Sequence, residues 1–236
     1  MSSGAVALLA VVVAVAAFVQ GSSGLGFALI VAPVVGIVAP GALPVFLLAL
    51  MVPLNSYVAW RERHSLDMRG AGWITAARLA STPAGLLVLV AVPDRHLGVL
   101  VGAATVLAAV VSLFAPAFAP GRRSYLAAGA VTGVTETATG VGGPPLALVY
   151  QHRPPAELRA TVATCFLAGQ IASLGALFVS GQAHTHELVP ALMAVPAVCL
   201  GVWLSRFAHR YLDAARMRIT VLVFALVSGA ALMVGL

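Results

Sequence analysis

The sequence Gly21-Ser-Ser-Gly-Leu-Gly-Phe27 interrupts the first hydrophobic run of the chain, placing three glycines and two serines between AVALLAVVVAVAAFV and ALIVAPVV. In a water-soluble protein this stretch would form a turn. At membrane depth it must do something else, because backbone amides freed from a helix find no water there unless protein or a hydrated cavity supplies partners. The composition of the whole chain distinguishes these two interpretations.

That composition indicates a polytopic membrane protein. Of 236 residues, 61% are hydrophobic and only 8% are charged, and the mean hydropathy is +1.04, whereas a globular domain has about 25% charged residues. Several runs approach or exceed the roughly 20 residues that cross a bilayer core as a helix. These runs are Ala5–Val19, Ala71–Val92, Leu97–Phe118 and Arg216–Leu236. The first run precedes any charged residue, so it lacks the basic start of a signal peptide and is predicted to be a retained helix.

The charges and cysteines argue against several functions. All 13 basic residues are arginines and the net charge is +6, which in a soluble protein would suggest a nucleic-acid partner. Here nearly all arginines lie in predicted loops, where they orient membrane helices, so we expect a lipid bilayer and no nucleic acid as a partner. Cys165 and Cys199 lie inside apolar runs, without the spacing of a disulfide framework or a metal site. We therefore expect no metal and no cofactor.

The chain also shows an internal repeat. One offset of 116 residues, without a gap, aligns Gly24 with Gly140, Gly26 with Gly142, Gly85 with Gly201 and Ser112 with Ser228. Broken segments, loops and long helices align at the same offset, which is typical of transporters built from structural repeats. We predict two homologous halves, residues 1–120 and 121–236, within a single membrane domain.

Each half is predicted to contain an interrupted pair of helices followed by three full-length helices. The first half contains the pair Ala5–Val19 and Gly26–Val38, then Pro44–Trp60, Ala71–Val92 and Leu97–Phe118. The second half contains the pair Tyr125–Thr137 and Gly142–Tyr150, then Leu158–Ser180, Leu188–Arg206 and Arg216–Leu236. The second member of each pair is too short to span a bilayer comfortably.

The arginines select between two topologies. If each interrupted pair is a hairpin that enters the membrane and returns, 11 arginines share one side and Arg95 alone lies on the other. If each pair is a single broken helix, the same loops divide five to seven. The positive-inside rule favours the hairpin, with both termini outside the cytoplasm. Each half then crosses an odd number of times, so the prediction is an all-α polytopic membrane protein made of two inverted repeats.

The glycines suit the tip of such a hairpin, because glycine accepts unusual φ values and permits close backbone approach. The tip leaves the amides of a helix N-terminus pointing inward, and these amides favour an anion. Two such tips, related by the repeat, would converge on one small anion. The first-half candidates are Gln20, Gly21, Ser22, Ser23, Gly24 and Gly26. The second-half candidates are Thr137, Thr139, Gly140, Gly142 and Gly143, ahead of a helix begun by Pro144 and Pro145.

The paired motifs GSSGLGFALIVAP and GVTETATGVGGPPL, in a chain of this length and pattern, resemble the TauE/SafE family of sulfite and organosulfur anion transporters. The resemblance extends over essentially the whole chain. It implies a multi-pass protein of the cell membrane that acts as a secondary carrier, commonly an exporter, of sulfite, sulfonates or related sulfur anions. Nothing in the spacing or periodicity of the residues indicates sulfur.

Two charged residues lie inside predicted membrane segments. Glu136 is an intramembrane carboxylate, which is costly to bury and is a functional hypothesis by default. Burial favours its neutral form, which suits a proton carrier; the alternative is a structural hydrogen bond that ties the hairpin to a neighbour. Arg78 lies about two turns into its helix, where it can pair with the substrate or with Glu136, or snorkel to the cytoplasmic surface.

Two amides follow the hairpins. Asn55 and Gln170 each lie deep in the helix after a hairpin, one position out of the repeat register. Either side chain can donate to a bound oxyanion, and either can instead join helices by hydrogen bonds, which is commonplace in membranes. We retain both as candidate substrate-binding residues.

Other functions compete with transport of a small anion. A membrane thiol oxidoreductase would relay electrons through Cys165 and Cys199, which lie on consecutive helices, although neither forms a Cys-X-X-Cys motif. A passive channel would differ from a carrier in saturation and turnover rather than in sequence. His184, His186 and Glu187 lie together in a loop but lack a usual metal-binding spacing. A secondary anion transporter, and not an enzyme, is the leading hypothesis, and the oligomeric state stays open.

Overall fold

The computed structural model describes residues 3–93, 96–114, 120–208 and 214–234, and every regular element within these ranges is a helix. The first half contains α1 (Ser3–Ser23), α2 (Phe27–Val38), η1 (Pro40–Ala42), α3 (Val45–Arg61), η2 (Arg63–Ser65), α4 (Met68–Ala91) and α5 (Leu97–Phe114). The second contains α6 (Arg122–Thr139), α7 (Gly143–Tyr150), α8 (Pro155–Val179), η4 (Thr185–Glu187), α9 (Leu188–Ala208) and α10 (Ala214–Val234). All ten predicted helices are present. Arg95, Arg210 and the predicted helix ends at Phe118 and Leu236 lie outside the described residues.

The interrupted pairs differ from the prediction in where the helix breaks. The sequence predicts that the first helix ends at Val19, but α1 continues through Ser23. The backbone pattern continues through the serines, because the Gly24 amide still donates to the Gln20 carbonyl at 2.7 Å. The two hydroxyls bond back along the same helix, Ser22 Oγ to the Phe18 carbonyl at 2.8 Å and Ser23 Oγ to the Val19 carbonyl at 2.9 Å. The break itself is only Gly24 to Gly26, with φ of 90° and 122° at its two glycines.

The second break is equally short. Helix α6 ends at Thr139, and Gly140 adopts the left-handed conformation with φ of 77°. Two prolines, Pro144 and Pro145, occupy the first turn of α7 as predicted. Both returning helices are shorter than the helices before them, with 12 residues in α2 and eight in α7. Each pair is therefore a long helix followed by a half-length one.

The outer surface suits a lipid environment. Four helical segments within the described ranges are long and apolar enough to cross a membrane, and shorter apolar helices accompany them. The four are Met68–Ala91, Leu97–Phe114, Pro155–Val179 and Thr185–Phe207. Large apolar side chains such as Leu87, Phe114 and Val179 lie exposed on the outside of these helices. The chain is thus a multi-pass membrane protein.

The helix contacts occur in related pairs. Helix α4 packs on α6 and α1 on α9; α4 packs on α8 and α3 on α9; α5 packs on α10 and α3 on α8. If α1 to α5 exchange places with α6 to α10, the α4–α6 contact becomes α1–α9 and the α4–α8 contact becomes α3–α9. The α5–α10 and α3–α8 contacts are unchanged by this exchange. The close approach of backbones also recurs, because a Cβ at Gly85 would lie 2.6 Å from the Val134 carbonyl oxygen and one at Gly201 would overlap the Ala14 carbonyl oxygen.

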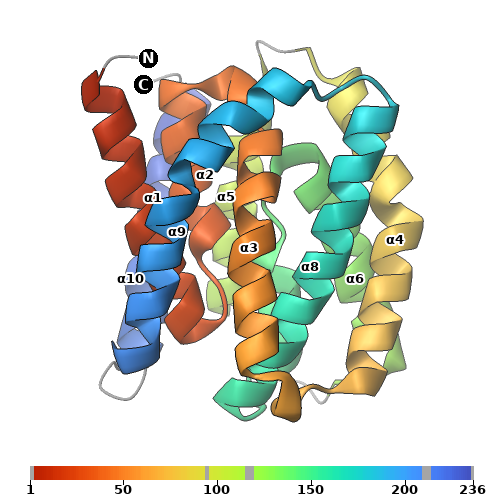
Figure 1. Ribbon diagram of the computed structural model, residues 1–236. Helices are drawn as coiled ribbons and strands as arrows, with labels where there is room; N and C mark the ends of the chain where they lie inside the picture. Colours follow the sequence, from red (N-terminus) through yellow and green to blue (C-terminus); the bar gives the residue numbers. More distant parts are fainter. Residues whose placement is uncertain (1–2, 94–95, 115–119, 209–213, 235–236) are drawn as a thin grey trace.

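The two ends of the bundle differ in charge. Figure 1 shows both chain termini at one end, with the α3–α4 and α7–α8 connections at the opposite end. The arginines at the starts of α4, α6 and α8 and at the end of α3 therefore gather at the end away from the termini. The end with the termini is closed by an apolar cluster of Val45, Leu48, Leu89, Leu177 and Ala183. We call the arginine-rich end the basic end.

Candidate functional site

A chain of buried polar side chains crosses the bundle between the two halves. Gln20 Nε2 donates to Asn55 Oδ1 at 3.0 Å, and Asn55 Nδ2 donates to Gln170 Oε1 at 3.1 Å. Gln170 Nε2 then donates to Glu136 Oε1 at 2.9 Å. All four side chains are at most 2% exposed. Four residues proposed separately from the sequence are therefore brought into one network.

Arg78 completes this network at its charged end. Its guanidinium donates to Glu136 Oε2 and forms an ion pair in which both side chains are fully buried. A second nitrogen donates to the Cys165 carbonyl at 2.8 Å, and the guanidinium lies over the Phe166 ring at 5.3 Å. The snorkelling interpretation of Arg78 is wrong, because the side chain is 0% exposed and turns inward to Glu136.

One donor of Arg78 stays unused. Its Nε is buried and has no hydrogen-bond partner among the described residues. Gly169 makes room for the guanidinium, since a Cβ at this position would overlap Arg78 Nε and Cζ. An unpaired donor on a buried cation is costly, and an acceptor such as an anion oxygen would satisfy it.

The two glycine tips contact this network or the helices that carry it. A Cβ at Gly142 would lie 2.8 Å from Glu136 Cβ, so the second tip passes directly beside the carboxylate. Thr132, one turn earlier on α6, donates to the Gly142 carbonyl at 3.1 Å. Each tip also packs on a helix of the other half: Gly24 on Leu158 of α8, and Gly140 on Leu47 of α3. Gly143 lies nearby, with the Phe166 ring 4.0 Å from where its Cβ would be. Leu158 is near the start of α8 and Leu47 is near the start of α3, and these two starts lie at opposite ends of the bundle (Figure 1), so the two tips do not converge on one point as predicted.

Several tip amides are already paired with side chains of their own hairpin. The Phe27 amide, the first of α2, donates to Gln20 Oε1 at 3.0 Å. The Leu25 amide donates to Ser23 Oγ at 3.3 Å, and the Val141 amide donates to Thr139 Oγ1 at 3.1 Å. The prolines at the start of α7 have no amide hydrogen to offer. In this structure the tips therefore hold fewer free donors than bare helix N-termini would.

The remaining first-half candidates lie against neighbouring helices. Gly21 packs on Ser205 of α9, and Gly26 packs on Val19 and Val221. The carbonyls that end α1 are held from outside the hairpin: Arg61 Nη2 donates to the Gly21 carbonyl at 2.7 Å, and Arg159 Nη1 to the Ser22 carbonyl at 3.5 Å. Glu62 Oε1 joins these two arginines, at 3.2 Å from Arg61 Nε and 3.1 Å from Arg159 Nε. This cluster links α3 of the first half to α8 of the second.

The thiol and histidine alternatives gain no support. Cys165 and Cys199 are both free; Cys165 is buried with its Sγ 3.9 Å from the Ala71 carbonyl, and Cys199 is exposed. His184 Nδ1 lies 3.2 Å from Glu187 Oε1 in an exposed pair. The part of the chain that the structure describes contains no group of three His, Cys, Asp or Glu residues able to hold a metal ion.

Sequence reasoning missed some contacts of the site. Thr137, a candidate from the sequence, forms a buried hydrogen bond of 2.7 Å with Ser173 Oγ, which joins α6 to α8 and was not predicted. Gln20 and Glu136 are 116 residues apart, the offset of the predicted repeat, and this spacing was a usable signal, since the two residues form the first-half and second-half ends of the chain of amides. Arg61, Glu62 and Arg159 appeared only as loop charges, because nothing local indicates which backbone they reach.

Comparison with known proteins identifies the family. The family model of the sulfite exporter TauE/SafE matches residues 8–232, nearly the entire chain. No curated protein and no solved structure matches the chain closely enough to be compared with it. With its multi-pass helical bundle and buried charged site, the chain belongs to the TauE/SafE sulfite exporter family.

Proposed function

We propose that this chain is a secondary active transporter that exports small sulfur-containing anions, such as sulfite or sulfonates, and couples their movement to protons. The anion would bind near the membrane midplane between the two glycine tips, at the Arg78–Glu136 pair. Family membership supports the anion class. The single observation that carries the site is a buried ion pair whose cation has an unpaired donor, set within a polar chain that joins both halves.

The pair supplies a coupling mechanism. While Glu136 is ionised it neutralises Arg78, and a second anion at the same place would meet a like charge in a low-dielectric interior. Protonation of Glu136 removes that charge and frees the guanidinium, which donates readily to oxyanions in a planar fork. The proton and the anion therefore bind together, and the anion leaves when Glu136 loses its proton to the opposite face. Because the proton and the anion move in the same direction, net export requires an outward gradient of the anion that is larger than any inward proton gradient.

Gln170, Asn55 and Gln20 extend the site. Their amides now donate to one another and to Glu136 in one direction along the chain. When Glu136 is protonated, Gln170 Nε2 loses a charged acceptor and becomes available to an anion oxygen. This series of hydrogen bonds ends at the Phe27 amide, the first of α2. A change in the protonation of Glu136 therefore alters the hydrogen bonding of the first glycine tip.

Alternating access would arise from rocking of two inverted halves, residues 1–120 and 121–236. Two observations support this division: the helix contacts exchange when the halves are exchanged, and both termini lie at the end away from the arginine-rich connections. Inverted repeats with a site at their interface are the common architecture of secondary transporters. The same arrangement implies termini outside the cytoplasm.

Flux into proteoliposomes tests the proposal, with sulfite, sulfoacetate, methanesulfonate, sulfate and chloride compared with and without a pH gradient. Sulfonates are the sharper probes of coupling, because they stay ionised at every working pH, whereas sulfite itself takes up a proton near neutrality. We expect saturable flux of at least one sulfur anion that responds to the pH gradient. Glu136→Gln should retain flux and lose this response.

Glu187→Gln provides the matched control, since it also removes one carboxylate but lies outside the site, in an exposed 3.2 Å pair with His184. Its pH response should equal that of the unchanged protein. Sulfonate flux that is independent of the pH gradient would exclude proton coupling. Absence of saturable flux for every sulfur anion would exclude the proposed substrate class.

A further inference from the structure

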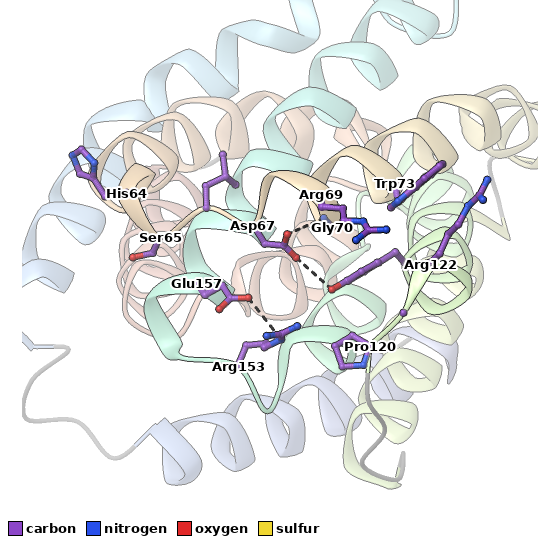
Figure 2. A pocket seen from close by; sticks show the side chains of 13 residues that line it. His64, Ser65, Asp67, Arg69, Gly70, Trp73, Pro120, Arg122, Arg153 and Glu157 are labelled. Carbon is purple, nitrogen blue, oxygen red and sulfur yellow. Dashed lines mark hydrogen bonds and ion pairs between the residues drawn. The ribbon is translucent and has the colours of Figure 1, made fainter.

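A polar basin opens at the basic end, separate from the buried ion pair. It has a volume of about 690 Å³ and is formed by the start of α4, the start of α6 and the connection from α7 to α8. Figure 2 shows Arg69 to the right of Asp67, Arg153 below it next to Glu157, and Arg122 beside Trp73. Three segments from both halves of the chain thus contribute a cation each to one cavity.

The charges of the basin favour an anion. Three arginines, Arg69, Arg122 and Arg153, line it together with two acids, Asp67 and Glu157. Both acids are already engaged. Asp67 Oδ1 accepts from the Gly70 amide at 3.0 Å, and Asp67 Oδ2 accepts from Tyr150 at 2.8 Å and Tyr125 at 3.3 Å. Glu157 faces Arg153 at 3.7 Å, a distance at which an incoming anion can compete.

A buried aromatic cluster lies between the basin and Arg78. Tyr125 and Trp73 line the basin and pack on this cluster, which contains Ile74, Tyr150 and Phe166. The Phe166 ring in turn contacts the Arg78 guanidinium, at 5.3 Å from the ring centroid. Helix α7 connects the buried ion pair to the basin. It begins next to Gly142, beside Glu136, and it ends at Tyr150, whose hydroxyl donates a hydrogen bond to Asp67.

We propose that the basin is a second anion-binding site, which captures the free oxyanion at the basic end before it passes the aromatic cluster to Arg78. This inference deepens the proposed function and rests on it for the identity of the anion. The ligand is a small sulfite or sulfonate group held by Arg69 and Arg153, while Arg122 is kept in place by stacking on Trp73 at 4.1 Å. A lipid phosphate has the same chemistry, so the test distinguishes the two sources.

The fluorescence of Trp73 reports on the basin without any need for flux. The chain has three tryptophans, so Trp60→Phe and Trp203→Phe leave Trp73 as the only one. Purified protein in nanodiscs of neutral phosphatidylcholine is titrated with methanesulfonate and with sulfite at constant ionic strength. We expect a saturable change in emission, and Arg69→Gln and Arg153→Gln should each weaken the apparent affinity about fivefold or more.

Two variants serve as controls. Arg63→Gln removes one charge at the same end, but Arg63 donates to the backbone carbonyl of residue 60 and does not line the basin, so the titration should not change. Glu136→Gln alters the buried pair and should also leave the titration unchanged. Equal weakening by Arg63→Gln would reduce the effect to general surface charge, and loss of the titration in Glu136→Gln would assign the signal to the central site; either result overturns the proposal.

The source of the anion is decided in nanodiscs that contain phosphatidylglycerol. If that lipid alone reproduces the emission change and free anions add nothing, the basin holds a headgroup and the proposal is wrong. If Trp73 titrates normally while proteoliposomes of the same protein show no flux, the proposed transport function fails and the basin stands. Saturable flux without any Trp73 response would overturn the basin and leave the transport function in place.

Discussion

Arg78 places a permanent positive charge in the interior of a membrane protein, where an isolated charge is costly. The structure compensates for it with Glu136, the Cys165 carbonyl and the face of the Phe166 ring. Removing one partner of a buried pair leaves the other charge unmatched, which costs about 3 to 5 kcal/mol. Removing both leaves no unmatched charge at this site.

We therefore predict a partial rescue at this pair. Arg78→Gln should lower the thermal unfolding midpoint in detergent strongly, and the double variant Arg78→Gln, Glu136→Gln should recover much of the loss. Arg206→Gln, which removes an exposed arginine that stacks on Trp203, is the matched control and should have little effect. A double variant no more stable than Arg78→Gln would show that the two side chains do not form a coupled pair.

Asp67, at the start of α4, is a titrating carboxyl at the basic end. Burial alone would raise the pKa of Asp67, but hydrogen bonds from the Gly70 amide and from the Tyr150 and Tyr125 hydroxyls outweigh it, so the pKa lies below its ordinary value. A carboxyl with a lowered pKa in the folded state stabilises the protein at neutral pH and loses that contribution as the pH falls.

The predicted outcome is an acid-dependent loss of stability that Asp67→Asn diminishes. The unfolding midpoint of the unchanged protein should fall between about pH 5 and pH 3, and that of Asp67→Asn should start lower and fall less over the same interval. Glu187→Gln, a change at the opposite end of the bundle, should preserve the full acid dependence. Parallel curves for the unchanged protein and Asp67→Asn would contradict the role given to this carboxyl.

At the scale of the element, the breaks in the two hairpins have separate backbone and packing requirements. Gly140 needs a left-handed conformation, and a Cβ there would also lie 2.6 Å from Leu47 Cδ1 of the other half. Gly181 has a similar φ of 72°, but a Cβ there would meet nothing within 4 Å. The two positions therefore share the conformational cost and differ only in packing.

This pair of glycines provides a test of the second tip. Gly181→Ala should cost about 1 to 2 kcal/mol for the left-handed conformation and leave flux nearly unchanged. Gly140→Ala should carry the same cost and in addition displace the tip from α3, so sulfur-anion flux should fall at least tenfold in folded protein. Comparable flux in the two variants would remove the second tip from the transport site.

At the scale of the whole molecule, the sidedness of the bundle follows from its arginines. The rule that cytoplasmic loops carry the excess of arginine predicts that the basic end faces the cytoplasm. His152 is exposed at that end, in the α7–α8 connection, and Gln182 is exposed at the other end, between α8 and α9. Single cysteines at these positions distinguish the two faces.

In a Cys165→Ala, Cys199→Ala background, Gln182→Cys should react with a membrane-impermeant maleimide in intact cells. His152→Cys should react only after the membrane is permeabilised. The reverse pattern would invert the proposed orientation. The same cysteine-free background should retain flux, and loss of all activity on removal of the thiols would instead revive the thiol-relay alternative.

Much of this fold was accessible before any tertiary information. Hydropathy and length predicted all ten helices, because in lipid each helix must satisfy its backbone N–H and C=O groups by hydrogen bonds within itself. This requirement is local and depends little on contacts between helices. The glycine clusters located both breaks, although the helix before the first break continues to Ser23 instead of ending at Val19. Intramembrane Glu136, Arg78, Asn55 and Gln170 were recognisable for the same reason, since polar groups are expensive there.

Their partners were not accessible in this way. Arg78 and Glu136 are 58 residues apart and Asn55 and Gln170 are 115 apart, so their pairing depends on how α3, α4, α6 and α8 pack together. Hydropathy along the chain does not indicate which helices pack together. The network around Arg78 and the arginine basin are products of the tertiary arrangement, because each joins side chains from helices that are far apart in the sequence. The capping of the tip amides is local, since each amide is bonded by a side chain two to seven residues earlier in the same hairpin.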